Sequence, residues 1–196
     1  NNSVTIPIKI TETASGMNST EFTASDISIL VNGTAVNPST KTLTYSSVSN
    51  GVYSYTLTLG GITLNGKVTI EIAAGTVKDI ATNSNVKTTL DPSITVNNTY
   101  TISLNGNGAT TAGTTAIYEK YNTGIYLDSD LKTAMTTSTN AITKPSKTGY
   151  TFKGYYTKEN GQGDQIINEN GYITENITST TYTANATLYA YYEDDI

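Results

Sequence analysis

Carboxylates are the side chains of this sequence that could supply acid or base chemistry, because the chain contains no histidine and no cysteine. The usual zinc sites and the Ser-His and Cys-His nucleophile systems are therefore excluded. Glycosidase chemistry needs two carboxyl groups facing one cleft, about 5 to 9.5 Å apart. Close acidic groups occur at Asp128 with Asp130 and in the run Glu193, Asp194 and Asp195. Helix capping and a solvated segment explain them more simply, so we predict no catalytic residue and no enzyme activity.

Oxygen ligands for calcium could come from Asp26, Asp79 and Asn83. A calcium loop of the EF-hand type places acidic oxygens at alternate positions, and these residues do not follow that pattern. Asp and Asn side chains also close local Asx turns. We therefore predict turns at these positions, with no metal site and no cofactor.

Tyrosines form the most distinctive candidate binding surface. Tyr189 and Tyr191 alternate with a second set of residues, Leu188, Ala190 and Tyr192. If that set fills the core, Tyr189 and Tyr191 lie on the opposite face of the strand, with Tyr155 or Tyr156 as neighbours. We predict Tyr189, Tyr191 and Tyr156 as candidate ligand contacts for a glycan or a protein. The alternative is that a thin domain without tryptophan uses tyrosine on both faces to bury area.

Composition predicts a mainly β protein. Charged residues make up 14% of the 196 residues, compared with about 25% in an average domain, while Thr, Ser and Asn fill the polar positions. The net charge of −5, with no run of basic residues, argues against nucleic acid as a partner. No apolar run approaches 18 residues, so we predict no membrane insertion in this segment.

Alternating apolar residues predict strands in the first half of the chain. They occur around residues 4–10, 27–31, 53–59 and 68–72, and Asn-Gly pairs typical of hairpin turns lie between some of them. Pro7 belongs on an edge strand, and the parity of Lys9 directs it to solvent. Short strands with turns and no helical pattern predict a β-sandwich.

Tyrosine usage changes around residues 91–99, since 12 of the 15 tyrosines follow that segment. We therefore predict two domains, residues 1–97 and 98–196. In the second, strands are expected near 100–104, 116–121, 150–157, 165–167 and 188–192. A short helix is expected over 129–138, capped by Asp128 or Ser129 and with Leu131 and Met135 on one face. The resulting order is ββαββ, a β-grasp-like layout.

Two stretches of the first domain carry a family resemblance: FTASDISILVNGT (22–34) and GKVTIEIAAGTVKDIATNSN (66–85). They resemble the Ig-like domains of bacterial surface proteins. The family often continues the second stretch with D-A-A-G-N, whereas this chain lacks that glycine after Asp79. The resemblance implies an Ig-like β-sandwich over residues 1–97.

The second domain resembles the Listeria-Bacteroides repeat, also called the internalin B-repeat. The similarity lies in KTGYTFKGYYTKENGQGDQII (147–167) and ATLYAYYE (186–193), where Tyr155 and Tyr192 occupy positions that are tryptophan in the family. The resemblance implies a secreted or cell-surface address in a bacterium. We accordingly expect a non-catalytic structural or adhesive stalk segment, monomeric within a longer multidomain chain. The alternative is a module that binds a host or matrix protein or a glycan through its surface tyrosines.

Overall fold

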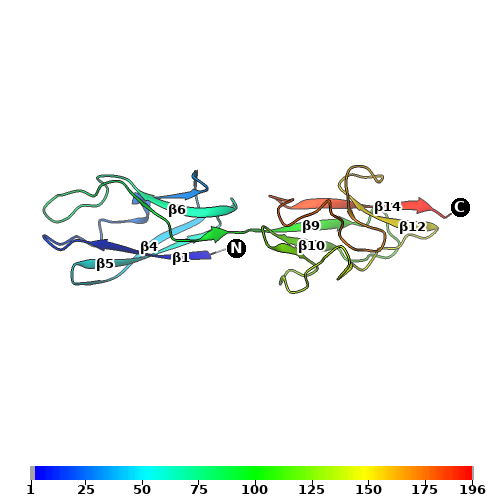
Figure 1. Cartoon of the computed structure of the whole chain (residues 1–196), viewed down its shortest axis with the longest axis horizontal. Coiled ribbons are helices and arrows are strands. Elements are labelled where there is room, and N and C mark those ends of the chain that lie inside the picture. The colour runs from blue at the N-terminus through cyan, green and yellow to red at the C-terminus, as the bar shows by residue number, and fades with distance from the viewer. Residues whose placement is uncertain (1–2, 196) are drawn as a thin grey trace. The chain divides into compact units, whose positions relative to one another are not determined.

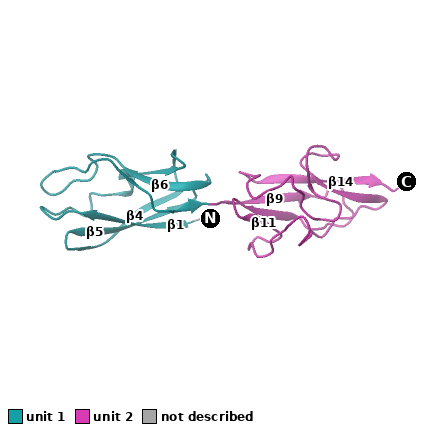
Figure 2. Cartoon of the chain, viewed as in Figure 1, with its two compact units in different colours: residues 1–96 teal, residues 97–196 magenta. Residues whose placement is uncertain are grey.

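The computed structural model describes residues 3–195, and its fold is mainly β (Figure 1). The chain divides into two compact units, residues 1–96 and 97–196 (Figure 2). Each unit has its own cluster of buried apolar side chains. The division between residues 96 and 97 lies inside the segment 91–99, where the use of tyrosine changes.

Unit 1 contains two sheets. The first has the order β1-β5-β4, and the second has the order β3-β2-β6-β7, with β8 also paired to β6. The strands are β1 (Ser3–Thr11), β2 (Ile27–Val31), β3 (Thr34–Val36), β4 (Thr40–Ser49), β5 (Val52–Gly60), β6 (Gly66–Ile72), β7 (Thr88–Leu90) and β8 (Thr95–Val96). A single 3-10 turn, η1 (Ala24–Asp26), precedes β2.

The core of unit 1 is built from side chains of both sheets. Leu57 of β5 and Val68 and Ile70 of β6 are fully buried and belong to one cluster. The burial of β1, β5 and β6 alternates along each strand, as the sequence predicts. Pro7 lies on β1, an edge strand of its sheet, and Lys9 is exposed. The edge position of Pro7 agrees with the expectation from its missing N–H, and the exposure of Lys9 agrees with the expectation from strand parity.

Asn-Gly pairs form two of the hairpin turns in unit 1. Asn32 and Gly33 join β2 to β3 with φ values of 48° and 80°, and Asn50 and Gly51 join β4 to β5 with 50° and 75°. Positive φ at both central residues is the requirement of the type I′ turn, whose twist matches that of the flanking strands. These turns fix the register of their hairpins.

Unit 2 contains one six-stranded sheet with the order β11-β10-β9-β14-β12-β13. Its strands are β9 (Thr99–Asn105), β10 (Ala116–Lys120), β11 (Gly124–Tyr126), β12 (Tyr150–Tyr156), β13 (Gln165–Ile167) and β14 (Ala186–Asp194). Neighbouring strands are antiparallel except β9 and β14, which are parallel. The first and last strands of the unit therefore lie side by side in the middle of the sheet.

The predicted helix over 129–138 is wrong, and with it the ββαββ order, because the described part of unit 2 contains no helix. The Asp128 carboxylate accepts hydrogen bonds from the backbone N–H groups of Lys132 and Thr133, farther along the chain than a helix N-cap reaches. Leu131 has a φ of 58°, which is left-handed and interrupts a right-handed helix. Met135 then donates its N–H to the Ile125 carbonyl, so the segment pairs with β11.

Segments between the strands take the place of the helix in the core of unit 2. They contribute four buried side chains, Met135, Ile142, Ile173 and Ile177. Tyr155 and Tyr192 belong to the same cluster and are 1% and 9% exposed. Both rings lie edge-on to Phe152, and the Tyr192 hydroxyl donates to the Gly106 carbonyl at 2.9 Å. Tyr155 and Tyr192 therefore both fill the core of unit 2.

Candidate functional site

The three predicted contact tyrosines lie on the outward face of β12 and β14. Along β14, the partly exposed Tyr189 and Tyr191 alternate with the buried Leu188, Ala190 and Tyr192, as the sequence predicts. Tyr156, also partly exposed, is the cross-strand partner of Tyr189. The pairing thus resolves which β12 tyrosine joins the group, because Tyr155 points into the core. We call Tyr156, Tyr189 and Tyr191 the tyrosine cluster.

Two contacts give the tyrosine cluster its shape. The rings of Tyr156 and Tyr191 stand nearly perpendicular, with centroids 5.9 Å apart and planes at 87°. The loop after β12 lies against Tyr191, since a side chain at Gly161 would meet that ring at 3.0 Å. Gly161 also has a φ of 67°, so two independent constraints favour glycine there. The loop was not foreseen from the sequence as part of this surface.

The electrostatics of the cluster are mild. Burial raises the pKa of the Tyr156 hydroxyl, so it remains protonated at neutral pH and can both donate and accept a hydrogen bond. Nearby, Lys153 pairs with Glu193 at 3.1 Å, and the hydrogen bond with Glu193 raises the pKa of Lys153. Aromatic faces with protonated hydroxyls suit stacking and hydrogen bonding to an uncharged polar ligand.

The acidic groups considered for catalysis make local contacts. Asp128 closes the turn described above, and Asp130 pairs with Lys132 at 3.2 Å. The hydrogen bond from the Lys132 backbone lowers the pKa of Asp128. Glu193 pairs with Lys153, and Asp195 accepts a hydrogen bond from the Thr151 hydroxyl. These contacts use the carboxylates within turns and between neighbouring strands.

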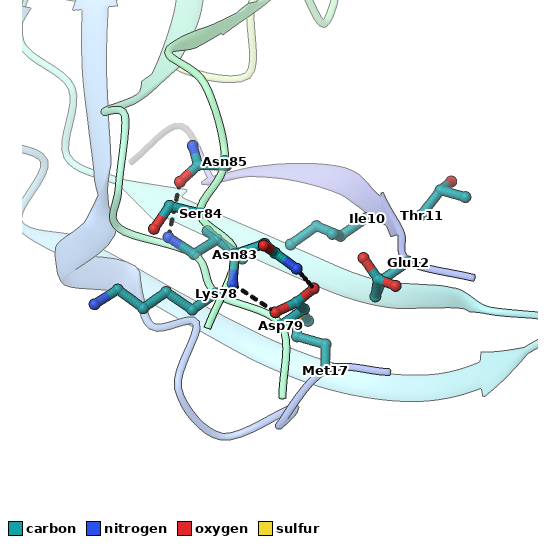
Figure 3. A pocket seen from close by; sticks show the side chains of 10 residues that line it. Ile10, Thr11, Glu12, Met17, Lys78, Asp79, Asn83, Ser84 and Asn85 are labelled. Carbon is teal, nitrogen blue, oxygen red and sulfur yellow. Dashed lines mark hydrogen bonds between the residues drawn. The ribbon is translucent and has the colours of Figure 1, made fainter. Parts of the chain in front are cut away.

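The loop around Asp79 in unit 1 borders a small hollow of about 150 Å³, also lined by Glu12, Met17 and Asn85 (Figure 3). One Asp79 oxygen accepts the Asn83 backbone N–H and the other accepts its side-chain amide, both at 2.7 Å. The side-chain bond from Asn83 lowers the pKa of Asp79. Asp79 and Asn83 thus close a local turn, wider than the two-residue span of the predicted Asx turn, and protein donors engage both carboxylate oxygens.

Asp26, the other acidic residue considered for calcium, caps η1. Its carboxylate accepts hydrogen bonds from the Thr23 backbone N–H at 2.7 Å and from the Thr23 hydroxyl at 2.9 Å. Across residues 3–195, no three acidic, histidine or cysteine side chains gather in a group that could hold a metal ion. Asp26 and Asp79 therefore serve separate local motifs.

Glu119 is a buried carboxyl group that the sequence reasoning missed. It is 0% exposed, and both carboxylate oxygens accept the Tyr182 backbone N–H, at 3.0 and 3.1 Å. Burial raises its pKa to about 7. The available signal was parity, because Glu119 lies two residues after the core residue Ile117 on the same strand. Glu119 ties the segment containing Tyr182 to the sheet.

No protein-family model matches the chain, and no match is found among curated proteins or solved structures. Within the described residues, the structure also holds no helix of the length and apolarity needed to cross a bilayer.

Proposed function

We propose that this chain is a non-catalytic structural and adhesive segment of a bacterial cell-surface or secreted protein. Unit 1 would be an Ig-like β-sandwich and unit 2 a module of the Listeria-Bacteroides repeat type, without the helix expected from the sequence. The segment would act as a monomer inside a longer multidomain chain, holding other parts of the protein away from the cell wall.

One observation carries the proposal: unit 2 receives the chain at one end of its sheet and releases it at the other. Because β9 and β14 are parallel and Ala186 pairs with Ile102, the path from Thr99 to Asp194 covers about eleven residue steps in one direction. At ~3.3 Å per residue, the entry and exit points lie roughly 36 Å apart. A unit with this connectivity separates the segments before and after it by the length of its sheet, as a spacer must.

The core of unit 2 supports its relation to the repeat family. Tyr155 and Tyr192 lie buried at the positions that are tryptophan in that family, and the Tyr192 hydroxyl has a backbone partner. An aromatic ring with a satisfied hydroxyl can replace tryptophan in such a core. In unit 1, two sheets that share one mainly aliphatic core support the relation to Ig-like sandwiches.

A second candidate is binding of a glycan or a host or matrix protein by the tyrosine cluster. It is favoured by the perpendicular, partly exposed rings of Tyr156 and Tyr191, with Tyr189 beside them. Such rings offer apolar faces and hydroxyl groups on one surface.

Module exchange separates the two candidates. In the full-length surface protein, residues 97–196 would be deleted or replaced by an unrelated rigid domain of similar end-to-end span. For a spacer, deletion reduces antibody access to the distal part of the protein, and replacement restores it. If replacement fails to restore access, the spacer role is wrong.

Direct binding is tested on a glycan array and on immobilised matrix proteins with the 196-residue chain. Binding that Tyr189→Ala and Tyr191→Ala abolish, and that Tyr118→Ala does not, would establish the second candidate instead. Tyr118 is a matched control because it is also partly exposed on this sheet, on β10, two strands away from β14. Hydrolysis of an array glycan, lost on changing one carboxylate, would contradict a non-catalytic role.

A further inference from the structure

The contact between β9 and β14 is the only parallel pairing in the described sheets, and its two strands are the first and last of unit 2. Ile102 to Asn105 pair in order with Ala186 to Tyr189. Neither strand is at an edge, since β10 lies beyond β9 and β12 beyond β14. We call this contact, residues 101–107 with 185–192, the seam.

Side chains extend the seam beyond its backbone pairing at both ends. At the entry end, the side-chain oxygen Oδ1 of Asn185 accepts the Thr101 backbone N–H at 2.9 Å. At the exit end, the Asn107 amide donates to the Ala190 carbonyl at 3.0 Å, and the Tyr192 hydroxyl donates to the Gly106 carbonyl at 2.9 Å. These three hydrogen bonds join the same two segments as the backbone ladder. They therefore add to its resistance against sliding of β9 past β14.

The seam is also locked by its side chains. Ile102, Leu104, Leu188 and Ala190 project from the two strands into the core and are at most 6% exposed. Sliding one strand past the other by a single residue would exchange its buried and outward faces. Relative movement along the strand direction therefore requires the apolar contacts and the ladder to break together.

Tension along the chain acts on the seam in that direction. Because the strands are parallel, the start of β9 and the end of β14 lie at opposite ends of the seam, so pulling them apart shears all the registered pairs at once. If the pull were applied at the same end of both strands, the pairs would instead open one after another. With four registered pairs, sharing the load raises the rupture force up to about fourfold.

We propose that the seam is a shear clamp by which unit 2 carries tensile load between the ends of the chain. This inference rests on the proposed spacer role and specifies it: unit 2 would hold its length under force, as required between a wall and an attached surface. Asn107, Asn185 and Tyr192 reinforce the clamp.

Single-molecule pulling on the 196-residue chain tests the clamp. Because the sequence contains no cysteine, introduced cysteine pairs give unique attachment points. Thr99→Cys with Asp194→Cys loads the seam in shear, whereas Thr99→Cys with Ala184→Cys loads it from one end; all three positions are exposed. We expect a rupture force at least about twofold higher in the shear geometry, since four pairs then share the load. Equal forces in the two geometries would overturn the proposal.

Variants of the reinforcing side chains sharpen the test. Asn107→Gly keeps the positive φ of 47° and removes the amide, and Asn185→Ala removes the acceptor at the other end. Each is expected to lower the shear rupture force and to leave the force for one-ended loading within error. Asn176→Ala is the matched control, since it removes a hydrogen bond from a side-chain amide to the Gln165 carbonyl, outside the seam. If Asn176→Ala lowers the shear force as much, the reinforcing role is wrong.

The pulling and module-exchange experiments test the clamp and the spacer role separately. Equal rupture forces would contradict the clamp alone if module exchange still restored access to the distal part of the protein. Conversely, ligand binding through the tyrosine cluster would replace the spacer role and leave the two rupture forces different. Thermal melts of each cysteine pair, compared with the unmodified chain, control for loss of fold.

Discussion

The two units differ less in strand content than in how the chain passes through them. In unit 1, Ser3 of β1 pairs with Gly60, Gly66 pairs with Val96, and only residues 61–65 separate Gly60 from Gly66. The first and last strands therefore begin and end at the same end of the unit. In unit 2, the parallel pairing of β9 and β14 places entry and exit at opposite ends. Connectivity thus decides which unit can resist tension in shear.

The cores differ in a related way. Unit 1 buries mainly aliphatic side chains between two sheets, whereas unit 2 has one sheet whose core is completed by aromatic rings and by side chains from the intervening segments. Both cores are mainly aliphatic, with Phe22 and Tyr55 buried in unit 1 and Phe152, Tyr155 and Tyr192 buried in unit 2. The units therefore differ in what packs on the sheet: a second sheet in unit 1, and the segments between the strands in unit 2.

The largest expected effect concerns the buried tyrosines of unit 2. Tyr155→Ala should lower the free energy of unfolding of unit 2 by about 3 to 5 kcal/mol, because a fully buried ring is lost and a cavity remains. The same change at the outward Tyr191 should cost about 1 kcal/mol or less. Hydrogen exchange read by mass spectrometry measures both units separately in the intact chain.

In that experiment unit 1 is the internal control. Its exchange should be unchanged by Tyr155→Ala, since the two cores are separate. If Tyr191→Ala proved the more damaging change, the roles assigned to the two faces of the sheet would be reversed.

A smaller effect, dependent on pH, is expected at Glu119. Its pKa in the folded state is raised to about 7 from the usual 4.5, so the folded protein binds the proton more tightly than the unfolded chain. The stability that this proton provides is present below pH 4.5 and is lost as the pH rises to about 7. The free energy of unfolding contributed by this proton falls by about 3 kcal/mol over that pH range.

Glu119→Gln isolates that contribution. The amide oxygen can still accept the Tyr182 N–H without carrying a charge, so the variant should be more stable than the parent at pH 8, by up to about 3 kcal/mol, and equal to it at pH 4. Urea unfolding at the two pH values measures both differences. A loss of stability at pH 8 would mean that the ionised carboxylate is favourable in place, contrary to the raised pKa.

The smallest effect compares two hairpin glycines of unit 1. Gly33 and Gly51 share a positive φ, but a Cβ at Gly33 meets nothing within 4 Å, whereas one at Gly51 would lie 2.7 Å from the Glu12 carbonyl oxygen. Gly33→Ala should cost about 1 kcal/mol from backbone strain alone. Gly51→Ala should cost about 2 to 3 kcal/mol, since a steric clash adds to the strain.

Thermal or urea unfolding of the two alanine variants provides the measurement, with hydrogen exchange to confirm that unit 2 is unaffected. Equal costs at both positions would show that the loop containing Glu12 moves away freely. The close packing of that loop on the hairpin would then not contribute to the stability of unit 1.

The alternation of β1, β5, β6 and β14 could be predicted from the sequence, because side chains of a strand change face at every residue wherever the strand lies. The same rule separated Tyr189 and Tyr191 from Tyr192. It did not detect β4, whose Thr- and Ser-rich sequence is largely exposed and has little apolar pattern. Predictions based on local periodicity succeeded where one face of a strand is buried.

The tertiary structure decided what depends on distant partners. Residues 129–138 carry a helix-like pattern, but pairing with β11 and the burial of Met135 in the sheet core favour an irregular loop of turns and bends. The burial of Glu119 follows from the segment around Tyr182 covering it. The seam joins strands about 80 residues apart, and no local pattern encodes which strands become neighbours. Side-chain direction is a local property of the backbone, whereas strand order is set by the lowest free energy of the whole core.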